Sequence, residues 1–416
     1  MKSEDGHVEK ISKAPKMVAA DVPKRGRIYY LVDDQYDFIP EAKEFFDWNA
    51  ATNHAPATLK AYCSRLLWYY RFLWQRHVRV LDATPADLTE FVIWLCNPYR
   101  ESAAVSPIHQ MSPLTASSVN LILQTVGAFY RFLLRRGKIS ESPVRYVDAP
   151  RGKWLTERDL LAHTRRGQAV VQRMELKLKE PGRLLPTVSE QDFQTFIDSI
   201  HMGQDPNGDP SGFRDRLLCL MLKEGGFRIG EILGLRMEDL EFGKQGVHVR
   251  FRPDNENGAR AKAGYGRDRF VHLPNDILGL LDIYLTEVWI EATPTTSHLW
   301  IVLNKHAKDR EGGSTYGAAL SVAAVEQMFR YYSERSRIKL HPHVLRHTHA
   351  TALVRSYLRE GEAVDWKFIQ ERLGHASVVT TMQTYTHLTN EDRKWAYDRY
   401  QERRSERAAQ RTGRQP

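Results

Sequence analysis

Apolar residues at intervals of three and four positions run through the first third of the chain and predict amphipathic helices. One apolar stripe spans residues 59–74, a second spans 88–95 and a third spans 119–133. Thr84 precedes a proline and an acidic residue, the pattern of a helix start, and Gly137 can end the third helix in a left-handed conformation. Several short helices without strands predict a compact helical domain over residues 28–150.

The apolar pattern changes its period in the second half of the chain. From Val247 to Phe251 apolar and polar residues alternate, which predicts a half-buried strand, and residues 269–273 supply a second strand after a long turn. Residues 299–303 fit a further strand, whereas the other segments have helical spacing. We therefore expect a mainly α (α+β) fold, in which residues 183–404 form a mostly helical domain with a small antiparallel β-sheet or hairpin.

Polar or charged segments without periodicity flank and separate these two domains. Residues 1–27 predict a flexible N-terminal arm, residues 151–182 a basic linker and residues 405–416 a loose, Arg-rich tail. The second domain is expected to start its first helix at Ser189, where Asp192 completes a motif like a capping box. Two domains with tails suit a chain of 416 residues.

Composition adds a weak indication about partners and compartment. The chain has 60 Lys and Arg against 51 Asp and Glu, a formal charge of +9, which fits a polyanionic partner. Its three cysteines are scattered and form no CxxC pair, so we expect reduced, buried thiols in a cytoplasmic protein. No secretory signal is expected, and no apolar stretch approaches the roughly 20 residues that span a bilayer.

Arginines interleaved with aromatic residues mark the surface of the helical domain. Two interpretations stay open: a solvated basic helix face, or a surface that binds a DNA groove. The arginines concerned are Arg65, Arg71, Arg76, Arg131, Arg135 and Arg136.

Two segments of the second domain carry basic residues beside glycines. In GGFRIGEILGLR (225–236) the glycine pair breaks a helix, so Arg228 starts the next one, where free N–H groups favour a phosphate. Glu231, one turn on, can hold the guanidinium, although such a pair is often a surface ion pair. The hairpin at 259–274 holds Arg260, Lys262, Arg267 and Arg269 among glycines, and these either reach into a groove or are solvated.

Two later segments bring histidines and a tyrosine. In HPHVLRHTHAT (341–351) a proline starts a helix, and His343 and Arg346 lie on one face of it. Four histidines here suggest zinc, but no cysteine or carboxylate has ligand spacing and HExxH is absent, so no metal is expected. In ERLGHASVVTTMQTYTHL (371–388) His375 follows a helix-ending glycine, Ser377 can cap the next helix, and Tyr385 lies two turns on among polar residues.

Taken in order, these residues resemble the tyrosine recombinase (phage integrase) family. GGFRIGEILGLR is similar to the family's first arginine box, HVLRHTHAT to the second and LGHASVVTTMQTYTHL to the nucleophile box, and the resemblance covers roughly residues 40–400. It implies a SAM-like core-binding domain followed by a catalytic domain. The catalytic residues it implies are Arg228, Lys262, His343, Arg346, His375 and Tyr385, supported by Glu231 and His347.

The resemblance also implies a role for each of these residues. Arg228 and Arg346 would bind the scissile phosphate, because fixed guanidiniums oppose the charge that builds on its oxygens. Tyr385 would form a 3′-phosphotyrosine and give its proton to His343, since its ordinary pKa is near 10. Lys262 would protonate the leaving oxygen, with Arg267 and Arg260 as alternatives because the hairpin is longer than in shorter family members. His375 would bind the phosphate or orient the tyrosine. Outside catalysis, Arg260 and Arg267 would contact DNA.

The function implied is site-specific DNA recombination for integration, excision or transposition of a mobile element, without metal or nucleotide cofactor. Such enzymes act as homotetramers on two DNA duplexes, and the compartment implied is the nucleoid of a bacterial cytoplasm. Two alternatives remain. A type IB topoisomerase shares most of the set, but His343 and the Leu-Gly-His element favour a recombinase. A DNA-binding regulator on a recombinase scaffold would not need the complete set.

Overall fold

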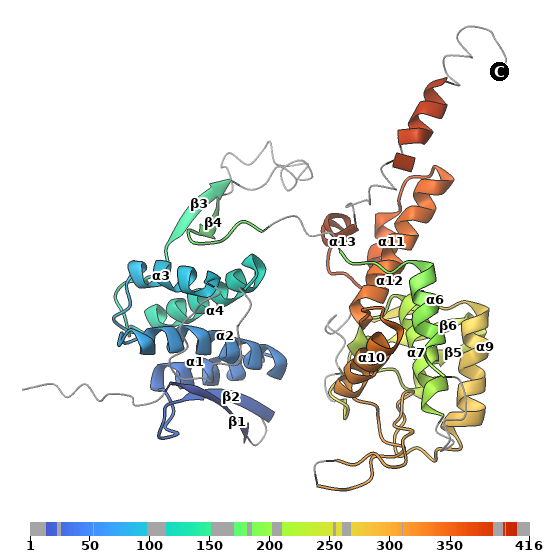
Figure 1. Cartoon of the computed structure of the whole chain (residues 1–416), viewed down its shortest axis with the longest axis horizontal. Helices are drawn as coiled ribbons and strands as arrows, with labels where there is room; N and C mark the ends of the chain where they lie inside the picture. The colour runs from blue at the N-terminus through green and yellow to red at the C-terminus, as the bar shows by residue number, and fades with distance from the viewer. Residues whose placement is uncertain are drawn as a thin grey trace, which may run out of the picture. The chain divides into compact units, whose positions relative to one another are not determined.

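The computed structural model divides into two compact units, Met1–Arg183 and Leu184–Pro416. The residues that the structure describes are 14–22, 26–52, 54–97, 114–150, 170–180, 185–201, 210–252, 255–259, 268–309, 311–385, 394–395 and 397–405. Within these ranges both units are mainly helical, as predicted, and both contain small antiparallel sheets, which were predicted only for the second unit (Figure 1).

In the ranges that the structure describes, the first unit has four helices and two antiparallel strand pairs. In chain order its elements are β1 (Lys16–Val22), β2 (Gly26–Val32), α1 (Pro40–Ala51), α2 (Pro56–Gln75), α3 (Pro85–Cys96), α4 (Ala116–Arg135), β3 (Tyr146–Pro150) and β4 (Val170–Met174). Helices α2, α3 and α4 contain the three predicted stripes. Thr84 caps α3 in a reciprocal box with Asp87, and Gly137 follows α4 with φ +65°, both as predicted.

The prediction of a helical domain without strands was wrong. Residues 16–22, which we assigned to the flexible arm, pair with β2 from Lys16↔Val32 onward. The apolar side chains of Met17 and Val18 pack against the core of the first unit. The burial of this apolar surface offsets the conformational entropy that the stretch loses when it becomes ordered.

Part of the expected linker also belongs to the first unit. Residues 170–174 form β4, paired with β3, and Met174 is buried in the core. The buried Asn120 of α4 donates to the Leu178 main-chain oxygen (3.0 Å) and accepts from the Leu178 N–H (2.9 Å). These bonds hold residues beyond β4 against α4, which the charged sequence of the linker did not indicate.

The second unit places a three-stranded sheet among helices. Its main elements are α6 (Glu190–Asp198), α7 (Ser211–Gly225), α8 (Ile229–Ile232), β5 (Leu240–Glu241), β6 (Gly246–Val249), β7 (Arg269–His272), α9 (Asn275–Ile283), α10 (Val322–Ser336), α11 (Pro342–Glu360), α12 (Trp366–Leu373) and α13 (Val378–Tyr385). Ser189 caps α6 by accepting from the Asp192 N–H (3.0 Å), as predicted. The sheet has the order β5-β6-β7, and Val247 pairs with Val271 in the predicted antiparallel hairpin.

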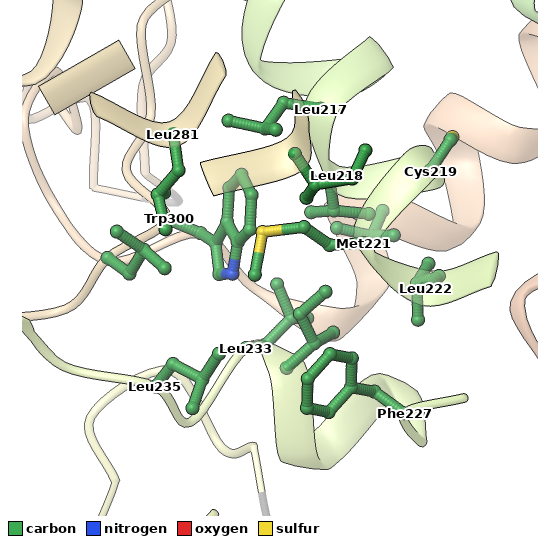
Figure 2. Close-up of a cluster of buried hydrophobic side chains, with 14 of the residues drawn as sticks. Leu217, Leu218, Cys219, Met221, Leu222, Phe227, Leu233, Leu235, Leu281 and Trp300 are labelled. Carbon is green, nitrogen blue, oxygen red and sulfur yellow. The ribbon is translucent and has the colours of Figure 1, made fainter. Parts of the chain in front are cut away.

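Residues 299–303 do not form the expected strand. They make an isolated bridge, Ile301↔Ala319, and lie in the core instead. Trp300 of this segment is fully buried and stacks on Tyr284 with 5.7 Å between ring centroids. Figure 2 shows the Trp300 indole beside Met221 of α7. Phe227, in the same core, directly precedes Arg228, so the packing of the core fixes where α8 begins.

Candidate active site on Glu231

Arg228 and Glu231 form a buried pair at the start of α8. Helix α7 is capped by the following residue, Gly226, whose φ of +63° turns the chain so that Arg228 becomes the N-cap of α8. The Arg228 N–H donates to Glu231 Oε2 (2.8 Å), and its Nη1 donates to Oε1 (2.6 Å). The Glu231 side chain has 0% exposure, whereas that of Arg228 has 20%. The pair is therefore not a surface ion pair.

Two further arginines approach the same carboxylate. Arg269, the first residue of β7, donates from Nη1 to Glu231 Oε1 (3.2 Å) and from Nη2 to Oε2 (2.7 Å). Arg346 of α11 has its Nη1 3.6 Å from Oε2. Burial raises the pKa of the Glu231 carboxyl, but attraction to Arg269, Arg346 and Arg228 outweighs it and holds the pKa at about 2. Glu231 is therefore ionised at neutral pH.

Arg346 joins the ends of two helices. Its side chain is only 1% exposed. Nη1 donates to the Gly226 main-chain oxygen at the end of α7 (2.7 Å), and Nη2 donates to the Leu373 oxygen at the end of α12. Arg228 Nη2 donates to the next oxygen, that of Gly374 (3.2 Å). Arginines from α8 and α11 thus converge on the turn that leads into His375.

His375 lies directly after the left-handed Gly374 (φ +61°) that ends α12. Its ring Nδ1 is 2.9 Å from the hydroxyl of the buried Thr381 in α13. Its main-chain N–H donates to the Gln370 main-chain oxygen (3.0 Å). Burial, followed by repulsion from Arg346 and Arg228, lowers the pKa of His375 to about 4. The ring is therefore neutral at neutral pH and can exchange hydrogen bonds without adding charge.

His343 and His347 lie one turn apart on α11, on either side of Arg346 in the sequence. Their ring centroids are 4.3 Å apart, with His343 exposed and His347 buried. Burial, followed by the electrostatic influence of His343 and Arg346, lowers the pKa of His347 to about 4. His343 is thus the outer ring of the pair, and the inner His347 packs against it.

Two of the predicted catalytic residues, Tyr385 and Lys262, lie partly or wholly outside the residues that the structure describes. Tyr385 is the last residue of α13, and only its main chain is described. Helix α13 packs against α12 and α11, and the Val379 N–H donates to Ser377 Oγ (3.2 Å), as expected for the cap. Lys262, Arg260 and Arg267 fall in residues 260–267, outside the described residues.

The described flanks of residues 260–267 are both attached near α8. Before the segment, Asn257 Nδ2 donates to the Leu233 main-chain oxygen (2.9 Å) and to that of Leu320 (3.0 Å), and Ala259 is fully buried. After the segment, Arg269 holds Glu231. The sequence reasoning missed these roles of Asn257 and Arg269, because both depend on partners distant in the chain.

The arginines of the first unit differ in their surroundings. Arg131 and Arg135 of α4 are exposed, and Arg65 of α2 is half-buried. Arg71 is half-buried too, and its Nε donates to the Pro15 main-chain oxygen (3.2 Å), next to β1. Arg71 therefore helps to hold the N-terminal hairpin, whereas the side chains on α4 can meet a polyanion.

The described part of the chain contains neither a candidate metal site nor a candidate membrane-spanning helix. No group of three His, Cys, Asp or Glu residues there could hold a metal ion. No helix in those ranges is long and apolar enough to cross a membrane.

Comparisons with known proteins agree with this architecture. The family model described as "Phage integrase family" matches residues 187–392, and "Phage integrase, N-terminal SAM-like domain" matches residues 44–137. Transposase A from transposon Tn554 of Staphylococcus aureus is 31% identical over 377 residues, which cover 91% of this chain and 95% of that protein. Tyrosine recombinase XerD of Lacticaseibacillus casei is 26% identical, covering 73% of this chain and 86% of that protein.

Solved structures show the same fold. The Tn1549 transposon integrase, in complex with a circular intermediate DNA, matches with a TM-score of 0.54 at 15% identity, over 86% of this chain and 98% of that chain. The XerH site-specific recombinase, bound to its difH substrate after cleavage, matches with a TM-score of 0.52 at 18% identity, over 85% of this chain and 82% of that chain.

Proposed function

Since this chain belongs to the phage integrase family of tyrosine recombinases, we propose that the arginine cluster on Glu231 is its DNA cleavage site. The chain is an enzyme that recombines DNA at specific sites by breaking and rejoining strands through a phosphotyrosine. We propose which residues do this chemistry and in which assembly they act.

The observation that carries the proposal is an excess of fixed positive charge. Arg228, Arg269 and Arg346 surround the carboxylate of Glu231, so three positive charges face one negative charge within this cluster. A phosphodiester brings one negative charge and develops more in the transition state. A preorganised, poorly solvated positive site stabilises that transition state more than the ground state.

Access to the two phosphate-binding arginines differs. Arg228 keeps 20% of its side chain exposed, whereas Arg346 keeps 1%. We expect the phosphate to reach Arg228 first, and Arg346 after the side chains that cover it move.

We assign the chemical step as follows. The Tyr385 hydroxyl attacks the phosphorus, the bond to the 5′-oxygen breaks, and a 3′-phosphotyrosine forms. The tyrosine proton goes to His343, and the departing 5′-oxygen takes a proton from Lys262. Resealing runs the same transfers in reverse, with a 5′-hydroxyl as the nucleophile. No bond energy is lost, so neither a nucleotide cofactor nor a metal ion is required.

The remaining assignments concern the biological setting. We propose that the DNA is that of a mobile element, because Tn554 transposase A matches nearly the whole chain. We also propose that the enzyme works as a homotetramer on two duplexes, in the cytoplasm of a bacterial host and on its nucleoid. Arg65, Arg131 and Arg135 would contact the DNA backbone, with Arg260 and Arg267 on the hairpin.

The test uses a nicked duplex that carries the recombination site, so that cleavage releases a short strand and traps the covalent adduct. Wild-type protein should give an adduct resistant to SDS, and Tyr385→Phe should give none. No adduct from wild type, or an equal adduct from Tyr385→Phe, would refute the assignment. Relaxation of supercoiled plasmids of any sequence without strand exchange would indicate a type IB topoisomerase. Specific binding without an adduct would indicate a regulator.

A further inference from the structure

We propose that Arg269, which lies outside the six catalytic residues, is a positioning residue for strand cleavage. The inference rests on the proposed function of the Glu231 cluster. In this role Arg269 holds Glu231 and the end of α12 in place, so that Arg228 and Arg346 keep their charge available for the phosphate.

All three nitrogens of the Arg269 guanidinium are engaged inside the protein. Nη1 and Nη2 donate to the two oxygens of Glu231 (3.2 and 2.7 Å), and Nε donates to the main-chain oxygen of Arg372 (3.0 Å). The side chain is only 9% exposed. A planar fork satisfies both carboxylate oxygens at once, which a lysine ammonium cannot do. Arg269 therefore acts on the site without contacting the substrate.

The second feature is a series of arginines along the end of α12. Three consecutive main-chain oxygens, those of Arg372, Leu373 and Gly374, each accept a hydrogen bond from a different arginine. The donors are, in the same order, Arg269, Arg346 and Arg228. These oxygens are the unsatisfied groups of a helix C-terminus, where positive charge is stabilising. The same three arginines meet at Glu231.

This double attachment links the phosphate-binding side of the site to the nucleophile side. One end of the link is Glu231 on α8; the other is the turn that leads to His375 and on to α13. A Cβ on Gly374 would lie 2.7 Å from Arg269 Nη1, so Arg269 packs directly against that turn. The position of His375 relative to Arg228 depends on Arg269 for this reason.

Arg269 also decides how Glu231 shares its charge. Without Arg269, the buried carboxylate would have only Arg228 and Arg346 as partners within this cluster. Arg346 Nη1, now 3.6 Å from Oε2, would be drawn into a direct ion pair. A guanidinium committed to a carboxylate is a weaker partner for a phosphate. Arg269 thus keeps Arg346 from pairing more closely with Glu231, which leaves the charge of Arg346 for the substrate.

The test compares Arg269→Gln and Arg269→Lys with a matched control, Arg214→Lys. Arg214 lies in the same unit, and its three nitrogens donate to the carboxylate of Asp215 and to the Ile301 oxygen. The hydrogen-bonding pattern of Arg214 therefore resembles that of Arg269, but Arg214 does not belong to the Glu231 cluster. Single-turnover cleavage of the nicked duplex is measured with a normal scissile phosphate, and with a methylphosphonate that lacks one negative charge. Thermal melting identifies a temperature at which each variant is folded.

We expect Arg269→Gln to bind the duplex within about twofold of wild type but to cleave the normal phosphate on the order of 100-fold more slowly, as misplaced catalytic groups do. The defect should shrink to less than about tenfold on the neutral methylphosphonate. Arg269→Lys, which keeps the charge but loses the fork, should fall between wild type and Arg269→Gln. Arg214→Lys should lower the melting temperature without slowing cleavage of the folded protein.

The proposal fails if folded Arg269→Gln cleaves at the wild-type rate. It also fails if Arg269→Gln cleaves both substrates with the same loss of rate and Arg214→Lys slows cleavage equally, as a general loss of stability would cause. Should Arg269→Gln not fold, Arg269→Lys decides the matter by the same two criteria. Failure of the proposed function looks different, because wild type itself would then give no adduct on Tyr385.

Discussion

The guanidinium of Arg346 donates a hydrogen bond to the main-chain oxygen of Leu373, 27 residues further along the chain. Arg346 lies on α11, next to the exposed His343, and Leu373 ends α12, two residues before His375. The side chain of Arg346 therefore sets the distance between α11, which carries the proposed proton acceptor His343, and the turn that carries His375. Glu231 completes the arrangement, since Arg228, Arg269 and Arg346 all meet there.

Replacing Glu231 by glutamine should remove the centre of this cluster. Breaking a buried ion pair by removing one partner costs about 3–5 kcal/mol, so Glu231→Gln should unfold at a markedly lower denaturant concentration at pH 7. Strand cleavage should also fall, because Arg228 and Arg346 lose their common partner. Urea titrations of the two proteins give the difference directly; equal midpoints would show that Glu231 does not stabilise the fold.

The same pair of proteins tests the pKa of Glu231. Its folded value, about 2, lies below the ordinary value of 4.5, so its contribution to stability is complete above pH 4.5 and is lost as pH falls towards 2. Wild type should therefore lose stability faster than Glu231→Gln below pH 4.5, with an added slope of up to about 1.4 kcal/mol per pH unit. Parallel curves down to pH 3 would contradict the ionised, buried carboxylate.

Gly226→Ala should destabilise the second unit through a local clash. A Cβ there would lie 2.5 Å from His349 Cδ2, and the φ of +63° disfavours any side chain. Gly137→Ala is a control with a similar φ, +65°, but with nothing within 4 Å of the new Cβ. We expect about 1 kcal/mol of destabilisation for Gly137→Ala and at least twice that for Gly226→Ala. Because the Gly226 oxygen accepts from Arg346, cleavage should fall in Gly226→Ala alone.

The assignment of Lys262 as the general acid predicts a selective rescue. Lys262→Ala should cleave a normal duplex on the order of 10²–10⁴-fold more slowly, the usual contribution of a proton donor. With sulfur in place of the 5′-bridging oxygen, the leaving group needs no proton, and the variant should approach the wild-type rate. Arg260→Ala and Arg267→Ala are the comparisons. If the sulfur substrate rescues Arg260→Ala or Arg267→Ala but not Lys262→Ala, the arginine replaced in that variant is the general acid.

DNA affinity should fall steeply with salt, and the two kinds of arginine in the first unit should differ in that test. Each phosphate contact contributes about one unit to the slope of log affinity against log salt. Arg135→Ala, on the exposed face of α4, should lower the slope by about one. Arg71→Ala should leave the slope unchanged, because Arg71 binds the Pro15 oxygen, and should instead weaken the N-terminal hairpin. The reverse result would place DNA on α2.

Local patterns were sufficient for much of the fold. Helix α11 follows from its proline start, α8 from the glycine pair before Arg228, and the β6–β7 hairpin from alternation. These signals lie within a few residues of the structure that they determine. The hairpin at 16–32 escaped prediction because Met17 and Val18 show no clear alternation, and their burial depends on helices that follow much later.

The arginines that meet at Glu231 stand in segments that the sequence singles out, but their connections to one another could not be predicted from it. Arg269 gains its importance from hydrogen bonds to Glu231, 38 residues earlier, and to the Arg372 main-chain oxygen, 103 residues later. Likewise, Asn257 has its place because the Leu233 and Leu320 oxygens lie within reach in the folded chain. No spacing within the sequence encodes such contacts, since they appear only when separate helices and strands pack.

The central claim, that DNA becomes attached to Tyr385, can be tested by locating the bond itself. The wild-type adduct from the nicked duplex is digested with trypsin and nuclease, and the peptide that retains a nucleotide is sequenced by mass spectrometry. We predict the peptide of residues 373–393, in which Tyr385 is the single tyrosine, with the nucleotide on that residue. A nucleotide on any other residue, or an adduct without one, would contradict the account.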